Sequence, residues 1–309
     1  MYYKMDYETF QDEIQKQVEE GMAGKGNFTF SLYRANKSNT TKIGLTISEK
    51  GKTISPTVYL SDYYMDYLQG TSLSEISREI MEFALGHQMP EVSTAEMPYY
   101  EKIKEKLRIR LVGLEGNRAY LEEGIYRPHL MGAEVVYLEL ANNSEGDFAV
   151  RVTSALLEKW GVPEKEVFNT ALKNSWEKSE LQFCSMEAEA GRILGMGTPE
   201  EEFITKNELY VVTNPERDYG AAVVLYPGAM EEIRSKMGRD FYILPSSVHE
   251  VLVMTRDSDF TPKELRDLVR DVNRTQVEPE LRLGNEVYEY LGETGTLQKC
   301  KIAEKERER

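Results

Sequence analysis

The stretch DFYILPSSVHEVLVM, from Asp240 to Met254, carries the clearest folding signal in this chain. Two apolar runs of strand composition flank a Pro-Ser-Ser corner, which is the pattern of a β-hairpin. In an extended strand, Ser247 and His249 would lie on one face and Glu250 on the other, because side chains alternate. The stretch therefore has two interpretations: a turn between two buried strands, or a serine nucleophile beside its base.

The second interpretation would make Ser246 or Ser247 the nucleophile of a hydrolase and His249 its base. Such a site also needs a group that orients the base and donors that stabilise the oxyanion. The Gly-x-Ser-x-Gly pattern of a nucleophile elbow is missing, and the sequence places no acid to orient His249. We therefore predict the hairpin, and Ser246, Ser247 and His249 remain the candidate catalytic residues of the alternative.

The hairpin belongs to a predicted C-terminal unit, residues 201–300, with the element order ββαββα. Its first two strands are expected at ELYVVTN and GAAVVLY, paired through the turn PERDYG, and its first helix at PGAMEEIRSKMG. Its last helix begins with the capping box Thr261-Pro262-Lys263-Glu264 and continues with apolar residues at helical spacing. The remaining residues, 301–309, form a charged tail that we expect to be frayed.

Two further units precede this one. Residues 1–95 are predicted to form an α-β-β-β-α unit, and residues 96–200 a middle α/β unit with a helical connector. The middle and C-terminal units share an order of strand pair, short helix and longer helix with an asparagine near its end, Asn174 or Asn273, which suggests tandem related α/β units. Antiparallel hairpins flanked by helices predict an α+β fold.

Composition limits the classes of function. The 309 residues carry a formal charge of −15, which argues against direct binding to a nucleic-acid backbone. No apolar run approaches the roughly 20 residues of a membrane helix. The polar, acidic N-terminus lacks a signal-peptide pattern, and Cys184 and Cys300 suggest no disulfide framework. We expect a cytoplasmic protein that does not bind membranes.

An anion site and a metal site each have candidate residues in the sequence. The segment LYPGAMEEI places Tyr226 and Gly228 where a strand would turn into a helix, whose N-terminal amides attract anions. Glu231 and Glu232 would repel an anion there, so a tight turn is the simpler interpretation. The three histidines, His87, His129 and His249, are isolated in sequence and form no metal-binding motif, so we expect neither a metal nor a cofactor.

Tyrosines form the last candidate site. In VYLSDYYMDYLQG, Tyr63 and Tyr67 lie on one helical face and Tyr64 lies on the next. Such residues pack half-buried against a core with their hydroxyls in water, or they form the surface that binds another protein. We keep Tyr63, Tyr64 and Tyr67 as candidate binding residues.

Long phrases of the chain resemble a known family. They are TISPTVYLSDYYMDYLQGTSLSEI, LLEKWGV, GAAVVLYPGAMEEI, DFYILPSSVHEVLVM and LRDLVRDVNRTQVEPE followed by LGNEVYEY. Together they resemble an uncharacterised bacterial family that carries only a domain-of-unknown-function label (DUF5688) and is common in gut clostridia. The likeness covers nearly the whole chain and implies no reaction or ligand.

We therefore expect a non-enzymatic module that binds another protein. The expectation rests on an acidic, tyrosine-rich composition without a complete catalytic set. Two alternatives remain: a serine hydrolase that uses the PSSVHE segment, and an acidic inhibitor from a mobile element that mimics DNA.

Overall fold

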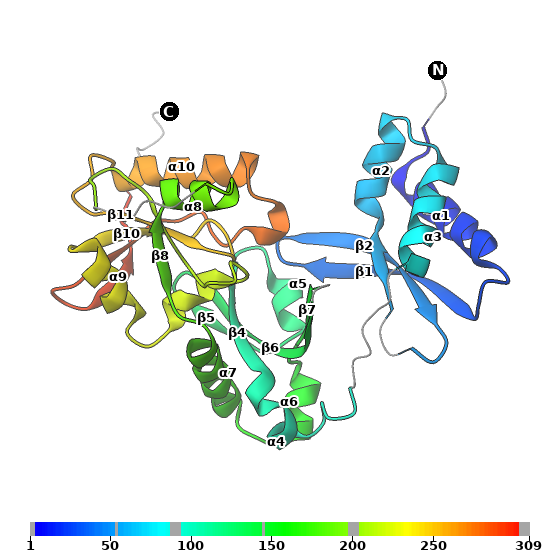
Figure 1. The fold of residues 1–309 in the computed structure, drawn as a ribbon, viewed down its shortest axis with the longest axis horizontal. Coiled ribbons are helices and arrows are strands. Elements are labelled where there is room, and N and C mark those ends of the chain that lie inside the picture. The colour runs from blue at the N-terminus through cyan, green and yellow to red at the C-terminus, as the bar shows by residue number, and fades with distance from the viewer. Residues whose placement is uncertain (1–3, 53–54, 87–93, 144–145, 197–203, 303–309) are drawn as a thin grey trace, which may run out of the picture. The chain divides into compact units, whose positions relative to one another are not determined.

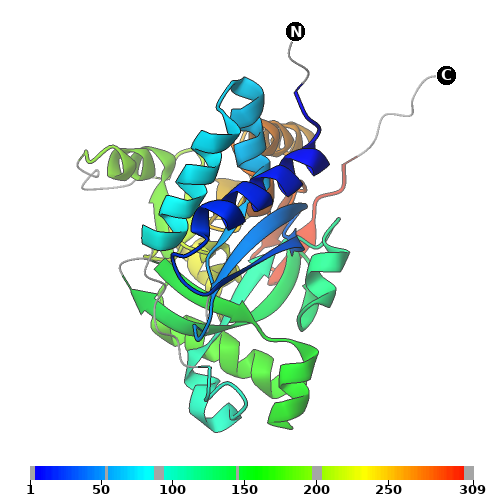
Figure 2. The same cartoon turned by 90° about the vertical axis from the view of Figure 1, so that its right-hand side faces the viewer.

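The computed structural model describes residues 4–52, 55–86, 94–143, 146–196 and 204–302. The chain divides into two compact units, Met1–Glu96 with Leu140–Gly146, and Met97–Glu139 with Asp147–Arg309. In the described ranges the strands form three antiparallel sheets, and helices accompany each unit (Figures 1 and 2). This arrangement confirms the predicted α+β class.

The first unit packs helices on a three-stranded sheet of order β1-β2-β3. Its core joins apolar residues of α1, β2 and α3, among them Phe10, Leu45 and Ile80, all fully buried. The structure places an additional helix, α2, directly after the short third strand. The elements are α1 (Tyr7–Met22), β1 (Phe28–Lys37), β2 (Thr40–Glu49), β3 (Thr57–Tyr59), α2 (Leu60–Gln69) and α3 (Leu73–Gly86).

A four-stranded sheet opens the second unit. Strand β6 pairs with β4 on one side and with β5 on the other, and β7 continues from it as a hairpin. Helix α7 packs along β4. The elements are α4 (Tyr100–Ile103), β4 (Leu107–Val112), α5 (Arg118–Glu122), β5 (Tyr126–His129), β6 (Gly132–Asn143), β7 (Gly146–Arg151), α6 (Ser154–Trp160) and α7 (Glu164–Lys178).

The second unit also contains a six-stranded sheet of order β13-β12-β10-β11-β9-β8. Its central pair, β10 and β11, confirms the predicted hairpin, with Phe241 opposite Thr255 and Leu244 opposite Leu252. The elements are β8 (Gln182–Ser185), α8 (Met186–Ile193), β9 (Tyr210–Thr213), η2 (the 3-10 helix Gly220–Leu225), α9 (Ala229–Met237), β10 (Phe241–Leu244), β11 (Val251–Thr255), α10 (Pro262–Thr275), β12 (Tyr288–Leu291) and β13 (Thr296–Lys299).

The predicted strand at GAAVVLY is wrong. The segment forms the 3-10 helix η2, in which Gly220 to Val224 are all buried. A short run that is apolar on every side has no period from which a strand can be told from a buried helical turn. Strand β9 pairs instead with β8 and β11, so the segment PERDYG is no hairpin turn.

Candidate functional site

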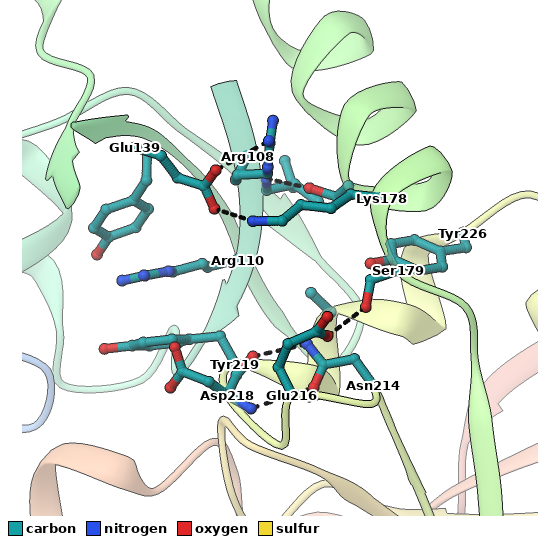
Figure 3. Close-up of a pocket in the computed structure, with 14 residues that line it drawn as sticks. Arg108, Arg110, Glu139, Lys178, Ser179, Asn214, Glu216, Asp218, Tyr219 and Tyr226 are labelled. Carbon is teal, nitrogen blue, oxygen red and sulfur yellow. Dashed lines mark hydrogen bonds and ion pairs between the residues drawn. The ribbon is translucent and has the colours of Figure 1, made fainter. Parts of the chain in front are cut away.

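A polar hollow of about 70 Å³ lies where β4, β6, the end of α7 and the segment after β9 meet (Figure 3). We call it the Arg110 hollow. Three cationic and three acidic side chains line it, together with the rings of Tyr137, Tyr219 and Tyr226. The charged lining residues are Arg108, Arg110, Lys178, Glu139, Glu216 and Asp218.

The two arginines reach the hollow because of the two-residue period of β4. Leu107, Ile109 and Leu111 are buried on one face of this strand, whereas Arg108 and Arg110 are partly exposed on the other. The buried N–H of Ile109 donates to the Ser175 hydroxyl at 2.9 Å, which ties the strand to α7. The sequence LRIRLV thus projects two guanidinium groups from one strand face.

Strand β6 supplies Tyr137 and Glu139 with the same spacing. Tyr137 lies directly opposite Arg108 in the β4–β6 ladder, and Glu139 is its neighbour on that face. The Glu139 carboxylate accepts from Arg108 at 3.0 Å and from Lys178 at 2.8 Å. One carboxylate therefore neutralises part of the charge of two cations, and both cations are already engaged.

Arg110 is held differently, by two aromatic faces. Its guanidinium carbon lies 4.3 Å from the ring centre of Tyr137 and 3.6 Å from that of Tyr219. In Figure 3 the Arg110 side chain extends along the Tyr219 ring. Within the described part of the chain, the Arg110 guanidinium has neither a hydrogen bond nor an ion pair. The stacking stabilises the cation and leaves its N–H edge without an acceptor.

The segment that presents Tyr219 has an unusual backbone. Arg217 and Tyr219 adopt positive φ angles of 57° and 46°, which are rare for bulky side chains. The Asn214 side chain holds the turn closed, because its amide donates to the Asp218 carbonyl at 2.8 Å and its oxygen accepts from the Asp218 N–H at 3.2 Å. Strain of this kind persists only where the surrounding structure enforces it.

Gly220 and His249 also hold this strained turn in its conformation. A Cβ on Gly220 would lie 2.1 Å from Thr213 Oγ1 and 2.6 Å from the His249 carbonyl oxygen, so only glycine fits. Thr213 donates to the same carbonyl at 2.7 Å. The His249 imidazole accepts from the Tyr219 N–H through Nδ1 at 3.2 Å. Tyr219 is therefore fixed over Arg110 by the segment that joins β10 to β11.

Two tyrosines retain protonated hydroxyls at neutral pH. Burial raises the pKa of Tyr226 to about 12 and also raises the pKa of Tyr219. A neutral phenol both donates and accepts a hydrogen bond. The hollow thus combines one unpaired guanidinium with hydroxyl groups that remain donors.

A larger groove of about 420 Å³ lies next to the hollow and shares Tyr226 with it. Trp176, Phe183 and Pro227 line this Trp176 groove, with Glu180, Glu232 and Lys236 as charged lining groups. Trp176 is 48 % exposed although it is a large apolar residue. Exposed tryptophan beside a concave surface is typical of positions where protein partners bind.

The predicted serine–histidine set has other contacts. Ser246 and Ser247 are buried, with 4 % exposure each. The Ser247 hydroxyl accepts from the His249 backbone N–H at 3.0 Å. The imidazole of His249 meets Tyr219 and lies 3.4 Å from the Asp218 carboxylate. The structure thus joins the His249 imidazole to Asp218 and Tyr219, whereas the Ser247 hydroxyl contacts the His249 backbone and the Ser247 backbone pairs with Arg282.

The predicted tyrosine set lies in the first unit. The rings of Tyr64 and Tyr67 lie 5.2 and 5.4 Å from that of Phe10, and Tyr63 also packs against the same core. The Tyr67 hydroxyl accepts from the Met5 N–H at 3.2 Å, and the Tyr64 hydroxyl donates to the Met5 carbonyl. All three are half-buried packing residues in this unit.

The remaining candidates are placed as follows. Gly228 has a φ of 79° and precedes α9, and Tyr226 lines both the Arg110 hollow and the Trp176 groove. His87 lies outside the described residues. The described residues contain no group of three or more His, Cys, Asp or Glu side chains that could hold a metal ion. Within the same ranges no helix has both the length and the apolar character to cross a membrane.

Sequence analysis missed Arg108, Arg110, Tyr137 and Tyr219. The alternation of leucine, isoleucine and arginine in LRIRLV was an available signal for the two arginines, because it places two cations on one strand face. No comparable signal links Arg110 to Tyr219, since the two residues come from distant parts of the chain.

Comparison with known proteins identifies one relationship. The model of a family of unknown function (DUF5688) matches residues 7–291, which is most of the chain. Searches of the curated proteins and of the solved structures gave no significant match. The chain therefore belongs to the family of unknown function DUF5688.

Proposed function

We propose that the protein is a cytoplasmic, non-enzymatic module that binds another protein through the Arg110 hollow and the adjacent Trp176 groove. One observation carries the proposal: a guanidinium group stacked between Tyr137 and Tyr219, with no counter-ion in the described part of the chain. Water or a ligand must supply the missing acceptor, because a cation that faces a polar hollow requires hydrogen-bond partners.

The size of the hollow favours a group on a large molecule over a free metabolite. At about 70 Å³ it is well below the roughly 300–1,000 Å³ of pockets that enclose small-molecule ligands. The end of a side chain or of a polypeptide fits such a space. The Trp176 groove beside it offers an exposed indole and the partly buried Phe183 to the rest of the partner.

The residue types are those that dominate binding energies between proteins. Arginine, tyrosine and tryptophan are enriched among interface positions whose truncation costs more than 2 kcal/mol. The hollow and groove contain all three types, joined through Tyr226. Side chains that are already held rigidly lose less entropy when a partner binds. The strained turn at Arg217 and Tyr219 holds Tyr219 in this way.

Affinity capture with matched variants tests the proposal. Tagged wild-type protein, Arg110→Ala and Trp176→Ala are used to capture proteins from a lysate of the source organism, and captured proteins are quantified by mass spectrometry. Arg274→Ala is the control, because Arg274 is exposed and its substitution makes the same change in charge.

The expected result is at least one protein that is enriched by wild type and by Arg274→Ala and lost with Arg110→Ala and Trp176→Ala. Urea unfolding of each variant confirms that it is folded. Equal capture by Arg110→Ala and wild type would contradict the proposal.

A further inference from the structure

We propose that the Arg110 hollow binds a single carboxylate group of the partner, from an acidic side chain or from a polypeptide C-terminus. This inference rests on the proposed binding function of the hollow and names the group that enters it. Three features carry it: the ion pairing within the lining, the free edge of the guanidinium, and the rigid support of Tyr219.

The lining holds three cations and three carboxylates, and its ion pairs leave Arg110 as the cation that a single negative charge can reach. Arg108 and Lys178 already share the Glu139 carboxylate, at 3.0 and 2.8 Å. Arg110 is the lining cation without an acidic partner among the described residues. Glu216 and Asp218 also line the hollow, and they would repel a dianion such as phosphate more strongly than a carboxylate.

The geometry selects a planar group. Tyr137 and Tyr219 cover the guanidinium with their rings at 4.3 and 3.6 Å, so a ligand reaches Arg110 at its edge. That edge carries parallel N–H donors whose spacing matches the two oxygens of a carboxylate. The Glu216 carboxylate accepts a hydrogen bond from the Ser179 hydroxyl at 2.6 Å, so it is already engaged within the protein.

The support of the hollow favours binding without rearrangement. Tyr219 is fixed by its backbone hydrogen bond to His249, and the turn before it is closed by Asn214. Tyr137 is 6 % exposed, and its hydroxyl pairs with that of Tyr120. The two tyrosine rings that cover the Arg110 guanidinium are therefore in position before a ligand binds.

NMR of the arginine side chains tests the inference directly. The Nε–Hε signals of ¹⁵N-labelled wild-type protein are followed during titration with acetate, inorganic phosphate, N-acetyl-glutamate amide and N-acetyl-diglycine. The last two probes separate a side-chain carboxylate from a C-terminal one. Arg110→Lys, which keeps the charge but lacks the paired donors, assigns the Arg110 signal and serves as the matched variant.

The expected result is a saturable shift of the Arg110 signal with acetate and with at least one of the two peptide probes, and binding at least about tenfold weaker with phosphate at pH 8. Arg110→Lys should weaken the binding of the carboxylate probes by at least about tenfold. Backbone amide shifts around the hollow measure this binding. A wild-type Arg110 signal that does not respond to any carboxylate, or that responds equally to phosphate, would overturn the inference.

The outcome is separable from that of the proposed function. If Arg110→Ala loses the captured protein while no carboxylate probe shifts the signal, the partner binds through another group and the carboxylate inference alone fails. If carboxylates bind while capture is unaffected by Arg110→Ala, the anion site exists and the proposed function fails.

Discussion

The Nδ1 atom of His249 accepts a hydrogen bond from the backbone N–H of Tyr219 at 3.2 Å, and the two rings pack 5.5 Å apart. A ring nitrogen that accepts this hydrogen bond carries no hydrogen of its own. The same atom lies 3.4 Å from the Asp218 carboxylate. His249, the candidate catalytic base of the sequence, thus supports Tyr219, whose ring covers Arg110.

Removal of that support should loosen the strained turn. His249→Ala is expected to lower the free energy of unfolding by about 1–3 kcal/mol, because it leaves the Tyr219 N–H without its acceptor. His249→Asn keeps an acceptor near the position of Nδ1 and should lose less than half as much. Urea unfolding monitored by circular dichroism measures both. Equal losses in the two variants would contradict the role assigned to Nδ1.

Gly220 provides a steric test of the same turn. Gly220→Ala should destabilise the protein by about 1–3 kcal/mol, because the new Cβ would overlap Thr213 Oγ1 and the His249 carbonyl. Gly86→Ala is the matched control, since a Cβ there meets nothing within 4 Å. Thermal unfolding of the two variants compares them. A Gly220→Ala protein as stable as the control would show that the turn has another conformation.

Glu250 should make stability depend on pH. Burial raises the pKa of this carboxyl above its ordinary value of 4.5, so the folded protein binds the proton more tightly than the unfolded chain. The contribution of Glu250 is therefore full below about pH 4.5 and is lost as the pH rises through the raised pKa.

The Glu250→Gln side chain cannot ionise, so this variant should not lose stability as the pH rises through the raised pKa of Glu250. We expect it to gain stability relative to wild type on going from pH 5 to pH 8, measured by urea unfolding at both values. Glu177→Gln, at an exposed position, is the control and should follow wild type. A Glu250→Gln protein whose stability falls with pH as much as that of wild type would contradict the predicted shift.

Ser246 and Ser247 should not react as hydrolase nucleophiles. Both are buried, and the Ser247 hydroxyl already accepts a hydrogen bond from the His249 backbone N–H. We expect a fluorophosphonate probe to leave the wild-type protein unlabelled under conditions that label a known serine hydrolase completely. Labelling that disappears in Ser247→Ala or Ser246→Ala, and in His249→Ala, would establish the hydrolase alternative instead.

Local patterns predicted the parts of the fold that depend on neighbouring residues. The β10–β11 hairpin follows from two apolar runs around a Pro-Ser-Ser corner. The capping box at Thr261 is present as predicted, with both reciprocal bonds to Glu264. Each of these features is complete within a few residues, so the sequence alone specifies it.

The candidate site depends on contacts that no local pattern contains. Arg110 leaves β4 on a predictable face, but its partner Tyr219 comes from a turn beyond β9. That turn was predicted as a hairpin loop, because GAAVVLY has strand composition. Its true course is set by the close packing of Gly220 against Thr213 and His249, which is tertiary information.

In the proposed complex the Arg110 guanidinium edge binds an external carboxylate. A crystal structure of the wild-type protein, grown without carboxylates and then soaked with N-acetyl-glutamate amide and, separately, with N-acetyl-diglycine, shows whether it does. We predict that in at least one soak the probe carboxylate accepts from Arg110 at about 2.7–2.9 Å while the Tyr137 and Tyr219 rings stay on the two guanidinium faces. A structure in which Arg110 pairs with a carboxylate of its own chain and both probes are absent from the hollow would contradict it.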